Sequence, residues 1–530
     1  MTAPIDSTPV ESKVSGDTER SEQKARAAGR GGVAVLGAKV FFILAGFVQQ
    51  ALLARAIGLA EYGALSRVLS KANVLNNVVV SGSTQGVSRA VARAPEHEEE
   101  AFRGALRVHA PLAVVLAVAF VLLAPVFAWF EHAPNIVMPL MTLGGVVLLY
   151  GLYAPLIGFL NGRAKFTRQA ALDVTFATLR TAFMVGIGYV YVKRGMSGAL
   201  GATIGFVLAA ACILPLALRW TGVGRAGTQS RMRPMQYLAE LIPLSGAQLF
   251  TNLLMQADIT LLGRFLSLGA AASGMRDNPQ HDADEWVGVY RACQLFAFLP
   301  YQLLFSITQV LFPMLARARA EGDEDAVRRY IARGARLGAI ACGLLVSVVA
   351  ALPGPLLAFA YPTEIAERGA TTLRVLALGQ GAFAMLGIAL TIMTSLGREW
   401  RAVMITAGAV AAVVVACWIF VPDTSFGEMQ LLRTSIATGS ALVVALLVAA
   451  TTVRRWTGAF VPLATAARVV LAVALCTAAG AYLPHFGKLV TPVLAVAVAA
   501  GYVVLLLVTR ELGRDDLASV KMMIGKRRAG

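Results

Sequence analysis

Long apolar stretches separated by short polar connections make up most of the chain. A helix needs about 20 apolar residues to cross the hydrocarbon core of a bilayer. Ten stretches of at least 19 residues lack Asp, Glu, Lys and Arg altogether: 110–130, 132–162, 195–218, 292–316, 337–363, 375–397, 402–422, 434–453, 469–487 and 489–509. Four more segments are long enough but carry charges or many polar residues: 34–57, 64–90, 169–192 and 237–266. This pattern predicts an all-α, polytopic membrane protein with about 14 transmembrane helices.

Composition agrees with this assignment and removes several alternatives. Of the 530 residues, 57% are hydrophobic and 15% are charged, whereas soluble globular proteins have about 45–50% apolar and about 25% charged residues. The mean hydropathy is +0.68. A disordered chain is excluded, because disorder requires low hydrophobicity and high charge. The five cysteines lie far apart in apolar stretches, which indicates neither a disulfide framework nor a metal site.

The Lys and Arg residues divide unequally between alternate connections, and this predicts the orientation. With the N-terminus in the cytoplasm, the cytoplasmic segments hold 33 of the 47 cations and the opposite connections only a few. The cytoplasmic face therefore accounts for the net charge of +17, and no nucleic-acid partner is needed. We expect residues 1–30 to be a disordered cytoplasmic tail before an uncleaved signal-anchor, since no secretory cleavage site is present. We expect residues 512–530 to be a basic cytoplasmic tail.

Short motifs recur in the same order and at similar offsets along the chain. They are Thr84-Gln85 with Thr308-Gln309, Ala92-Arg93-Ala94 with Ala318-Arg319-Ala320, and Gly162-Arg163 with Gly397-Arg398. Six predicted helices separate the copies, so the halves face the same way, as in a parallel repeat. We therefore expect a six-helix lobe at 31–235, a second at 236–456 and two extra helices at 457–511. Two such lobes usually enclose a central cavity and work by alternating access.

Polar residues form a stripe along the second predicted span. They are Ser66, Ser70, Asn73, Asn77, Ser81, Thr84 and Ser88, at spacings of three or four residues that place them on one helix face. Packing of small polar residues between helices would give the same pattern. The two asparagines are large for close packing, so we favour a cavity wall and take Asn73, Asn77 and Thr84 as substrate-binding candidates.

The eighth predicted span, the repeat partner of the second, alternates amide and aromatic side chains. Gln294 and Gln302 lie among Phe298, Tyr301 and Phe305. Amides and aromatic rings suit the hydroxyl groups and apolar faces of sugars, although an ordinary amphipathic helix has the same pattern. We include both glutamines among the cavity candidates.

Charges inside spans are candidates for function, because each costs about 2.5–3.5 kcal/mol at a helix centre on insertion scales. Seven are cationic and two are acidic: Lys39, Arg67, Lys71, Arg180, Arg264, Arg291, Arg374, Asp173 and Asp258. A surplus of cations suits an anionic ligand, and the guanidinium fork matches phosphate oxygens. We assign Lys71, Arg180 and Arg291 to substrate binding.

The other charges have simpler interpretations. Arg55 and Arg67 are expected to be cations near a membrane interface, and Arg264 and Arg374 can also extend to an interface. Asp258 either pairs with Arg264 or Arg291, or binds H⁺ or Na⁺ as a coupling ion. No other cofactor is expected.

One connection combines potential metal ligands. His281, Asp282, Asp284 and Glu285 lie in the predicted outer connection 267–285. A solvated loop is favoured over a metal site there.

Several motifs resemble those of a known family. The sequences Leu52-Leu53-Ala54-Arg55-Ala56-Ile57-Gly58 and Glu61-Tyr62-Gly63 resemble the first hairpin of polysaccharide repeat-unit flippases. Asp258-Ile259-Thr260-Leu261-Leu262-Gly263-Arg264-Phe265, Val287-Gly288-Val289-Tyr290 and Leu311-Phe312-Pro313 are similar to its seventh and eighth helices. The family belongs to the multidrug/oligosaccharidyl-lipid/polysaccharide exporter superfamily, and the resemblance covers most of the first 12 spans.

The resemblance implies a transporter rather than an enzyme. It would move undecaprenyl-pyrophosphate-linked oligosaccharide across the bacterial inner membrane, among membrane lipids and alongside a polysaccharide polymerase or assembly machinery. A lipid II flippase and a cation-coupled multidrug antiporter stay open as alternatives. A membrane polysaccharide polymerase or ligase is least favoured, because it would need a large outer loop, and the longest outer connection has about 19 residues.

Overall fold

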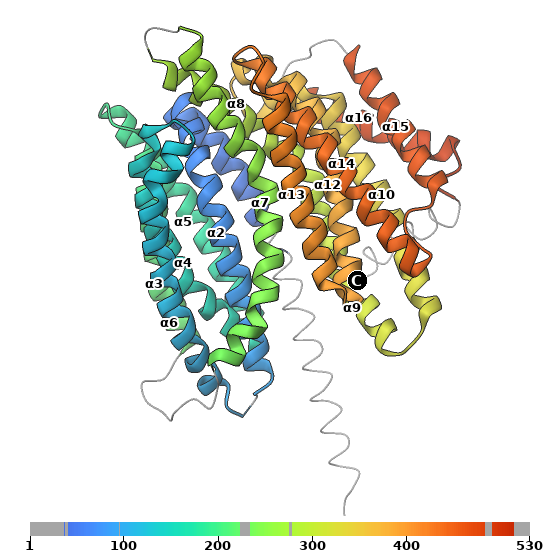
Figure 1. The fold of residues 1–530 in the computed structure, drawn as a ribbon, viewed down its shortest axis with the longest axis horizontal. Helices are drawn as coiled ribbons and strands as arrows, with labels where there is room; N and C mark the ends of the chain where they lie inside the picture. Colours follow the sequence, from blue (N-terminus) through green and yellow to red (C-terminus); the bar gives the residue numbers. More distant parts are fainter. Residues whose placement is uncertain are drawn as a thin grey trace, which may run out of the picture.

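The computed structural model describes Gly37 and residues 41–94, 96–222, 234–274, 278–482 and 490–513. Every regular element in these ranges is a helix, which confirms the all-α class. Two groups of helices stand side by side, with a helical hairpin at the far edge of the second group (Figure 1). Lys39 and the tail 1–30 lie outside the described residues, as does nearly all of the tail 512–530.

The N-terminal lobe is formed by the first part of the chain. Its elements are the helix Phe41–Ile57, α2 (Leu59–Ala92), α3 (Glu98–Phe130), the 3₁₀ turn η1 (Pro134–Ile136), α4 (Val137–Gly162), α5 (Phe166–Lys193) and α6 (Gly198–Thr221). Within the lobe, α2 and α3 pack on α4, and α5 packs on α6. Within the described part of the chain, α2 makes the most extensive contact with the second lobe, through α7 and α8, and α3 makes a smaller contact with α7.

The C-terminal lobe follows. Its elements are α7 (Pro234–Ala272), α8 (Pro279–Ala297), α9 (Leu299–Ala320), α10 (Glu324–Ala351), α11 (Pro353–Ala360), α12 (Thr363–Ser395), α13 (Glu399–Phe420) and α14 (Glu428–Thr457). The hairpin of α15 (Leu463–Ala481) and α16 (Thr491–Val508) packs on α10. Glu511, just beyond α16, joins them through ion pairs of 2.8 Å to Arg336 and 2.9 Å to Arg468.

Local capping chemistry sets several helix ends. The side chains of Ser197 and Asp323 accept hydrogen bonds from backbone N–H groups at the starts of α6 and α10. Gly222 and Gly458 end α6 and α14 in the left-handed conformation, with φ of 65° and 70°. We call the end of the molecule where α2, α6 and α8 begin the Arg67 end, at the top of Figure 1, and the opposite end the Arg219 end.

The predicted helix count is supported only approximately. Among the described residues, 12 helices are long and apolar enough to cross a membrane, and neither α2 nor Phe41–Ile57 is one of them. The exact total of 14 is therefore not confirmed, although each of the 14 predicted segments overlaps a helix. The predicted span 292–316 is divided between α8 and α9, with Pro300 in the first turn of α9.

The predicted outer loop 267–285 is wrong in most of its length. Helix α7 continues to Ala272, and α8 begins at Pro279. Asn278 caps α8 by accepting a hydrogen bond from the backbone N–H of His281. The polar residues that suggested a loop are the first turns of a helix, and one of them is buried against the other lobe, as described below.

The hydrophobic core shows where the two lobes pack against each other. The core of the N-terminal lobe continues into the second lobe through Val287, Leu357, Tyr361 and Leu373, which all lie toward the Arg67 end. A separate core fills the rest of the C-terminal lobe and reaches Tyr502 of α16. Helix α7 contributes to both cores, so it lies between the lobes.

Large apolar side chains are exposed on the outer faces of the helices. On α3, Val115 and Leu122 are 62% and 70% exposed, and similar side chains line α13 and α14. A membrane requires such surfaces, because helices surrounded by lipid present apolar residues outward. The molecule is therefore a multi-pass membrane protein.

Candidate functional site

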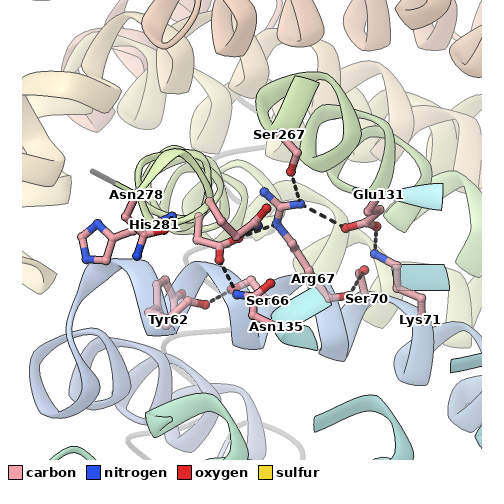
Figure 2. Close-up of polar contacts among 12 residues, drawn as sticks. Tyr62, Ser66, Arg67, Ser70, Lys71, Glu131, Asn135, Ser267, Asn278 and His281 are labelled. Atoms are coloured by element: carbon pink, nitrogen blue, oxygen red, sulfur yellow. Dashed lines mark hydrogen bonds and ion pairs between the residues drawn. The ribbon is translucent and has the colours of Figure 1, made fainter. Parts of the chain in front are cut away.

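A buried ion-pair cluster joins the two lobes at the Arg67 end. Arg67 of α2 is fully buried, and its Nε lies 2.8 Å from Oδ1 of Asp284 on α8. Its Nη1 donates to the hydroxyl of Ser267 on α7 at 3.0 Å and lies 3.5 Å from Oε2 of Glu131. Figure 2 shows these contacts converging on the guanidinium. A single side chain of the first lobe thus binds two helices of the second.

A second cation completes the charge balance. Lys71, one turn along α2 from Arg67, forms an ion pair with Oε1 of Glu131 and is 8% exposed (Figure 2). Glu131 caps the C-terminal end of α3 and is fully buried. We call Arg67, Lys71, Glu131 and Asp284 the Arg67 cluster. It contains two cations and two carboxylates, so it is neutral as a unit and each buried charge has a partner.

Further hydrogen bonds orient the carboxylate of Asp284. Its Oδ2 accepts from Nδ2 of Asn135, beside α4, at 2.7 Å. Its Oδ1 accepts from Nε2 of Gln280 at 3.2 Å. The carboxylate is therefore held from both lobes, since Asn135 belongs to the first lobe and Gln280 to the second.

The backbones of α2 and α8 touch at this same end. A Cβ atom on Gly63 would overlap the backbone oxygen of Asp284, and one on Gly288 would lie 2.7 Å from the backbone oxygen of Leu59. The hydroxyls of Tyr62 and Tyr361 are 3.4 Å apart. Helices this close leave no space for a passage between them at these residues.

One prediction about these residues is wrong and one is untested. Arg67, predicted to be a cation near a membrane interface, is fully buried and paired with carboxylates from other helices, and its depth in a membrane stays a prediction. Asp284 was expected in a solvated loop, but it is 2% exposed. Among the described residues no group of three or more His, Cys, Asp or Glu could hold a metal ion, and His281 is a half-exposed side chain on α8.

Asp258 forms a second buried polar group, within the C-terminal lobe. Its carboxylate accepts from the Tyr290 hydroxyl at 2.8 Å and from Nε2 of Gln294 at 3.0 and 3.1 Å. Arg291 donates to Oε1 of the same Gln294 at 3.1 Å. The neutral amide thus lies between the carboxylate and the guanidinium, so Asp258 is linked to Arg291 indirectly.

Arg264 does not pair with Asp258, contrary to one of the predictions. It donates to the backbone oxygen of Phe130 and lies over the rings of Phe130 and Trp418, at 4.9 and 5.5 Å. Because Phe130 ends α3, this contact also joins the lobes at the Arg67 end.

Arg180 lies in a different part of the N-terminal lobe. Its Nε donates to Oε1 of Gln49 at 2.9 Å, and its guanidinium lies 5.0 Å from the Phe42 ring and 5.8 Å from the Phe206 ring. Its described contacts are to neutral groups, and it is half-buried. Arg55 is exposed on the same first helix as Gln49.

The polar stripe of α2 divides into parts with different surroundings. Ser66 and Ser70 are buried, and their hydroxyls donate to backbone oxygens one turn earlier. Asn73 is half-buried, and Asn77 is exposed and donates to Asn252 of α7 at 2.6 Å. Ser81, Thr84 and Ser88 are half-buried as well, so the stripe is buried only at its start, and the cavity wall stays a prediction.

Two further candidates contact their neighbours. The Thr84 hydroxyl donates to the backbone oxygen of Ala154 on α4 at 3.3 Å, as expected for helix packing. Gln302 is half-buried on α9, away from the Gln294 group on α8. The structure therefore brings together Lys71 with Arg67, and Gln294 with Asp258 and Arg291, but not all the candidates in one site.

The sequence reasoning missed His109. It is 3% exposed on α3, with Nδ1 3.0 Å from the Ser83 hydroxyl and Nε2 2.8 Å from the Tyr237 hydroxyl of α7. This contact joins α7 to the N-terminal lobe toward the Arg219 end. The sequence did offer a signal for this residue, because His109 directly precedes the charge-free stretch 110–130.

Comparisons with known proteins agree with the fold. The chain shares the fold of "Lipid II flippase MurJ, inward closed conformation", with a TM-score of 0.68 and 12% identity over 91% of this chain and 99% of that one. An inward-facing multidrug resistance MATE family transporter aligns with a TM-score of 0.60 and 16% identity over 80% of this chain and 98% of that one. A multidrug/oligosaccharidyl-lipid/polysaccharide superfamily transporter from Pyrococcus furiosus aligns with a TM-score of 0.54 and 14% identity, over 80% and 95%.

The sequence itself matches one family. No curated protein matches it significantly. A family model described as "Polysaccharide biosynthesis protein" matches residues 28–319, more than half of the chain. This agrees with the resemblance found in the motifs of the first hairpin and of α7 and α8. The chain belongs to the polysaccharide biosynthesis protein family.

Proposed function

We propose that the protein is a flippase that moves undecaprenyl-pyrophosphate-linked oligosaccharide repeat units to the outer leaflet by alternating access. The observation that carries the proposal is the Arg67 cluster, a neutral set of buried charges drawn from both lobes at one end of the molecule. We infer that this end is the outer end, as the distribution of cations predicts. The cluster would hold the outer end closed while the substrate loads from the cytoplasmic side.

Buried ion pairs suit a contact that must break and reform. In a dry interior the attraction between opposite charges is strong, and it offsets the cost of removing them from water. When the lobes separate and water enters, each charge is hydrated again, so both states keep the charges satisfied.

Residues outside the Arg67 cluster offer groups that suit the substrate. Arg180 and Arg291 make their described contacts with neutral groups and are half-buried. Neither guanidinium forms a direct ion pair with a carboxylate among the described residues, which favours an anionic ligand, such as a pyrophosphate, over a cationic drug. Asn73 and the exposed Asn77 add amides that can donate to and accept from sugar hydroxyls.

A lipid II flippase is the second candidate. Its substrate carries the same kind of lipid pyrophosphate, so Arg180 and Arg291 would serve it equally well. The likeness to the lipid II flippase also covers 91% of this chain, against 80% for the MATE transporter. The family match favours the polysaccharide substrate.

The test is deletion of the gene followed by extraction of membrane lipids. We expect lipid-linked repeat units to accumulate on the cytoplasmic leaflet while cell-wall precursors stay at their normal level. Accumulated lipid II would support the second candidate. Drug hypersensitivity with normal surface polysaccharide would contradict both.

Complementation of this deletion with single variants compares the contributions of Arg180 and Arg374 to transport. Arg180→Ala should restore surface polysaccharide less well than Arg374→Ala, because Arg374 donates to the backbone oxygen of Ala350 and serves as a structural control. Equal complementation at equal expression would contradict a substrate role for Arg180.

Coupling to H⁺ or Na⁺ through Asp258 is part of the proposal. The carboxylate accepts only neutral donors in its described contacts, so a cation could exchange with them. Transport in proteoliposomes should respond to one of the two ion gradients and lose that response in Asp258→Asn. The same gradient dependence in the variant would exclude this carboxylate.

A further inference from the structure

A pocket lies between the start of α5 and the end of α6, at the Arg219 end. Its volume is about 370 Å³. It is lined by Thr167, Arg168, Ala171, Arg219 and Trp220. It is in the N-terminal lobe and includes none of the residues of the Arg67 cluster.

The pocket presents two guanidiniums to the surroundings. Arg168 and Arg219 are both exposed, and within the described ranges neither forms an ion pair. Nη1 of Arg168 donates to the backbone oxygen of Trp220 at 2.7 Å, which fixes one edge of the guanidinium and leaves its other N–H groups for a ligand. The Thr167 hydroxyl is a further donor on the same wall.

The neighbouring charges are positive as well. Partial burial and the charges of Arg163 and Arg168 lower the pKa of Lys165, and Glu98 offsets this only in part. Glu98 is itself engaged with Arg163, whose Nε lies 2.7 Å away. The surroundings of the pocket therefore favour an anion.

The position of the pocket selects the kind of anion. Helices α5 and α6 are both long and apolar enough to cross the membrane, so their ends lie at the level of the lipid headgroups. Tryptophan and arginine are typical of this level, where Trp220 and the two guanidiniums lie. We propose that the pocket binds the headgroup phosphate of an acidic membrane lipid. This proposal does not depend on the substrate that the protein transports.

A related corner in the other lobe provides a matched comparison. The sequence Arg-Trp-Thr-Gly at 219–222 recurs at 455–458, and both copies end a helix at a left-handed glycine. In the second copy, Arg398 and Arg401 lie over the Trp456 ring, at 5.1 and 4.4 Å. There the guanidiniums already contact an aromatic face, whereas Arg168 contacts a backbone oxygen and faces the pocket.

The test is a lipid titration of the full-length protein in detergent, followed by native mass spectrometry. Phosphatidylglycerol is the probe, and phosphatidylcholine is the zwitterionic control. We expect one phosphatidylglycerol to bind to the wild type more tightly than phosphatidylcholine. Arg168→Gln with Arg219→Gln should weaken that binding about tenfold or more, because two charge-assisted hydrogen bonds are lost. Arg398→Gln with Arg401→Gln should leave it unchanged.

Other outcomes would overturn the proposal. They are phosphatidylglycerol binding at wild-type affinity in the Arg168/Arg219 variant, or an equal loss in the Arg398/Arg401 variant. Displacement of the lipid by inorganic phosphate at similar concentrations would assign the pocket to a free anion instead. If the double variant fails to fold, the single variants Arg168→Gln and Arg219→Gln replace it, and each should weaken binding about threefold or more.

Discussion

Helix α2 meets the second lobe through different chemistry at its two ends. At the Arg67 end, the contact consists of charges and of helix backbones that touch at Gly63 and Gly288. Toward the Arg219 end, it consists of neutral hydrogen bonds and interleaved side chains. There Ser83 of α2 bonds to His109 of α3, which in turn bonds to Tyr237, and Gly86 of α2 faces the side chains of Leu241 and Tyr237.

The difference indicates which contact is built to separate. The attraction within an ion pair is strong where water is excluded. When water enters, hydration of each charge replaces that attraction, so access of water decides whether the pair stays formed. A neutral hydrogen bond between packed side chains contributes only about 0.5–1.5 kcal/mol net, and separating it exposes apolar surface in both partners. We infer that α7 stays on the N-terminal lobe near Tyr237 when the outer end opens, and that this opening is concentrated at the Arg67 cluster.

The largest effect is expected from removing one charge of the Arg67 cluster. Arg67→Met leaves Asp284 buried without its cation, which should destabilise the closed Arg67 end by about 3–5 kcal/mol. Thermal unfolding and the reactivity of a cysteine placed at Ser66 measure this. The double variant with Asp284→Leu removes both charges and should be less damaged than the sum of the single variants. Additive effects would contradict coupling between the two residues.

A smaller effect is expected from forcing the backbones apart. Gly63→Ala places a methyl group against the backbone of Asp284, which cannot move aside as a side chain can. Overpacking of this kind costs about 1–3 kcal/mol. The same cysteine reactivity should rise. Gly246→Ala is the matched control, because nothing lies within 4 Å of its added Cβ. If the two variants behave alike, close approach of α2 and α8 is not what seals this end.

Removing the neutral contact between His109 and Tyr237 should destabilise the protein less than the changes at the Arg67 end. It should also leave the Arg67 end closed. Tyr237→Phe removes the hydrogen bond to His109 and should cost about 1 kcal/mol of stability. Cysteine reactivity at Ser66 should stay at the wild-type level. A rise equal to that in Gly63→Ala would show that both ends separate together.

The smallest effect is expected from an ion pair outside the lobe interface. Burial alone would raise the pKa of Glu511, but hydrogen bonds from Arg336, Thr465 and Arg468 outweigh it and lower the pKa. The stability gained from Glu511 is therefore present above its ordinary pKa and is lost as the pH falls through the lowered value. Melting temperatures of wild type and Glu511→Gln should converge on acidification. A difference between the two melting temperatures that grows at low pH would contradict a lowered pKa for Glu511.

The fold was predictable because the length of an apolar stretch can be read from neighbouring residues in the sequence alone. The apolar stretches located nearly every membrane helix, and the motifs of the first hairpin and of α7 indicated the family. The α8 region was misjudged because a polar helix start and a loop have the same composition. Asn278 and Pro279 were signals for a helix start that the polar residues around them obscured.

The candidate site was predictable only in part. Helical spacing selected Arg67 and Lys71, but it could not show what covers them. Their partners Glu131 and Asp284 are 60 or more residues away in the sequence, and Asp284 lies in the segment predicted to be a solvated outer loop. Glu131 was a usable signal, since it is a single acidic residue between the charge-free stretches 110–130 and 132–162. Tertiary contacts of this kind require the fold.

A reversible cross-link tests most directly whether the Arg67 end must open. Cysteines at Tyr62 and Tyr361, whose hydroxyls are 3.4 Å apart, can be joined by a short bifunctional thiol reagent in a Cys212→Ser background. The measurement is translocation of a fluorescent lipid-linked oligosaccharide by proteoliposomes. We predict that cross-linking forms in the resting protein and abolishes translocation, and that cleavage of the cross-link restores it. Undiminished translocation by the fully cross-linked protein would contradict the account.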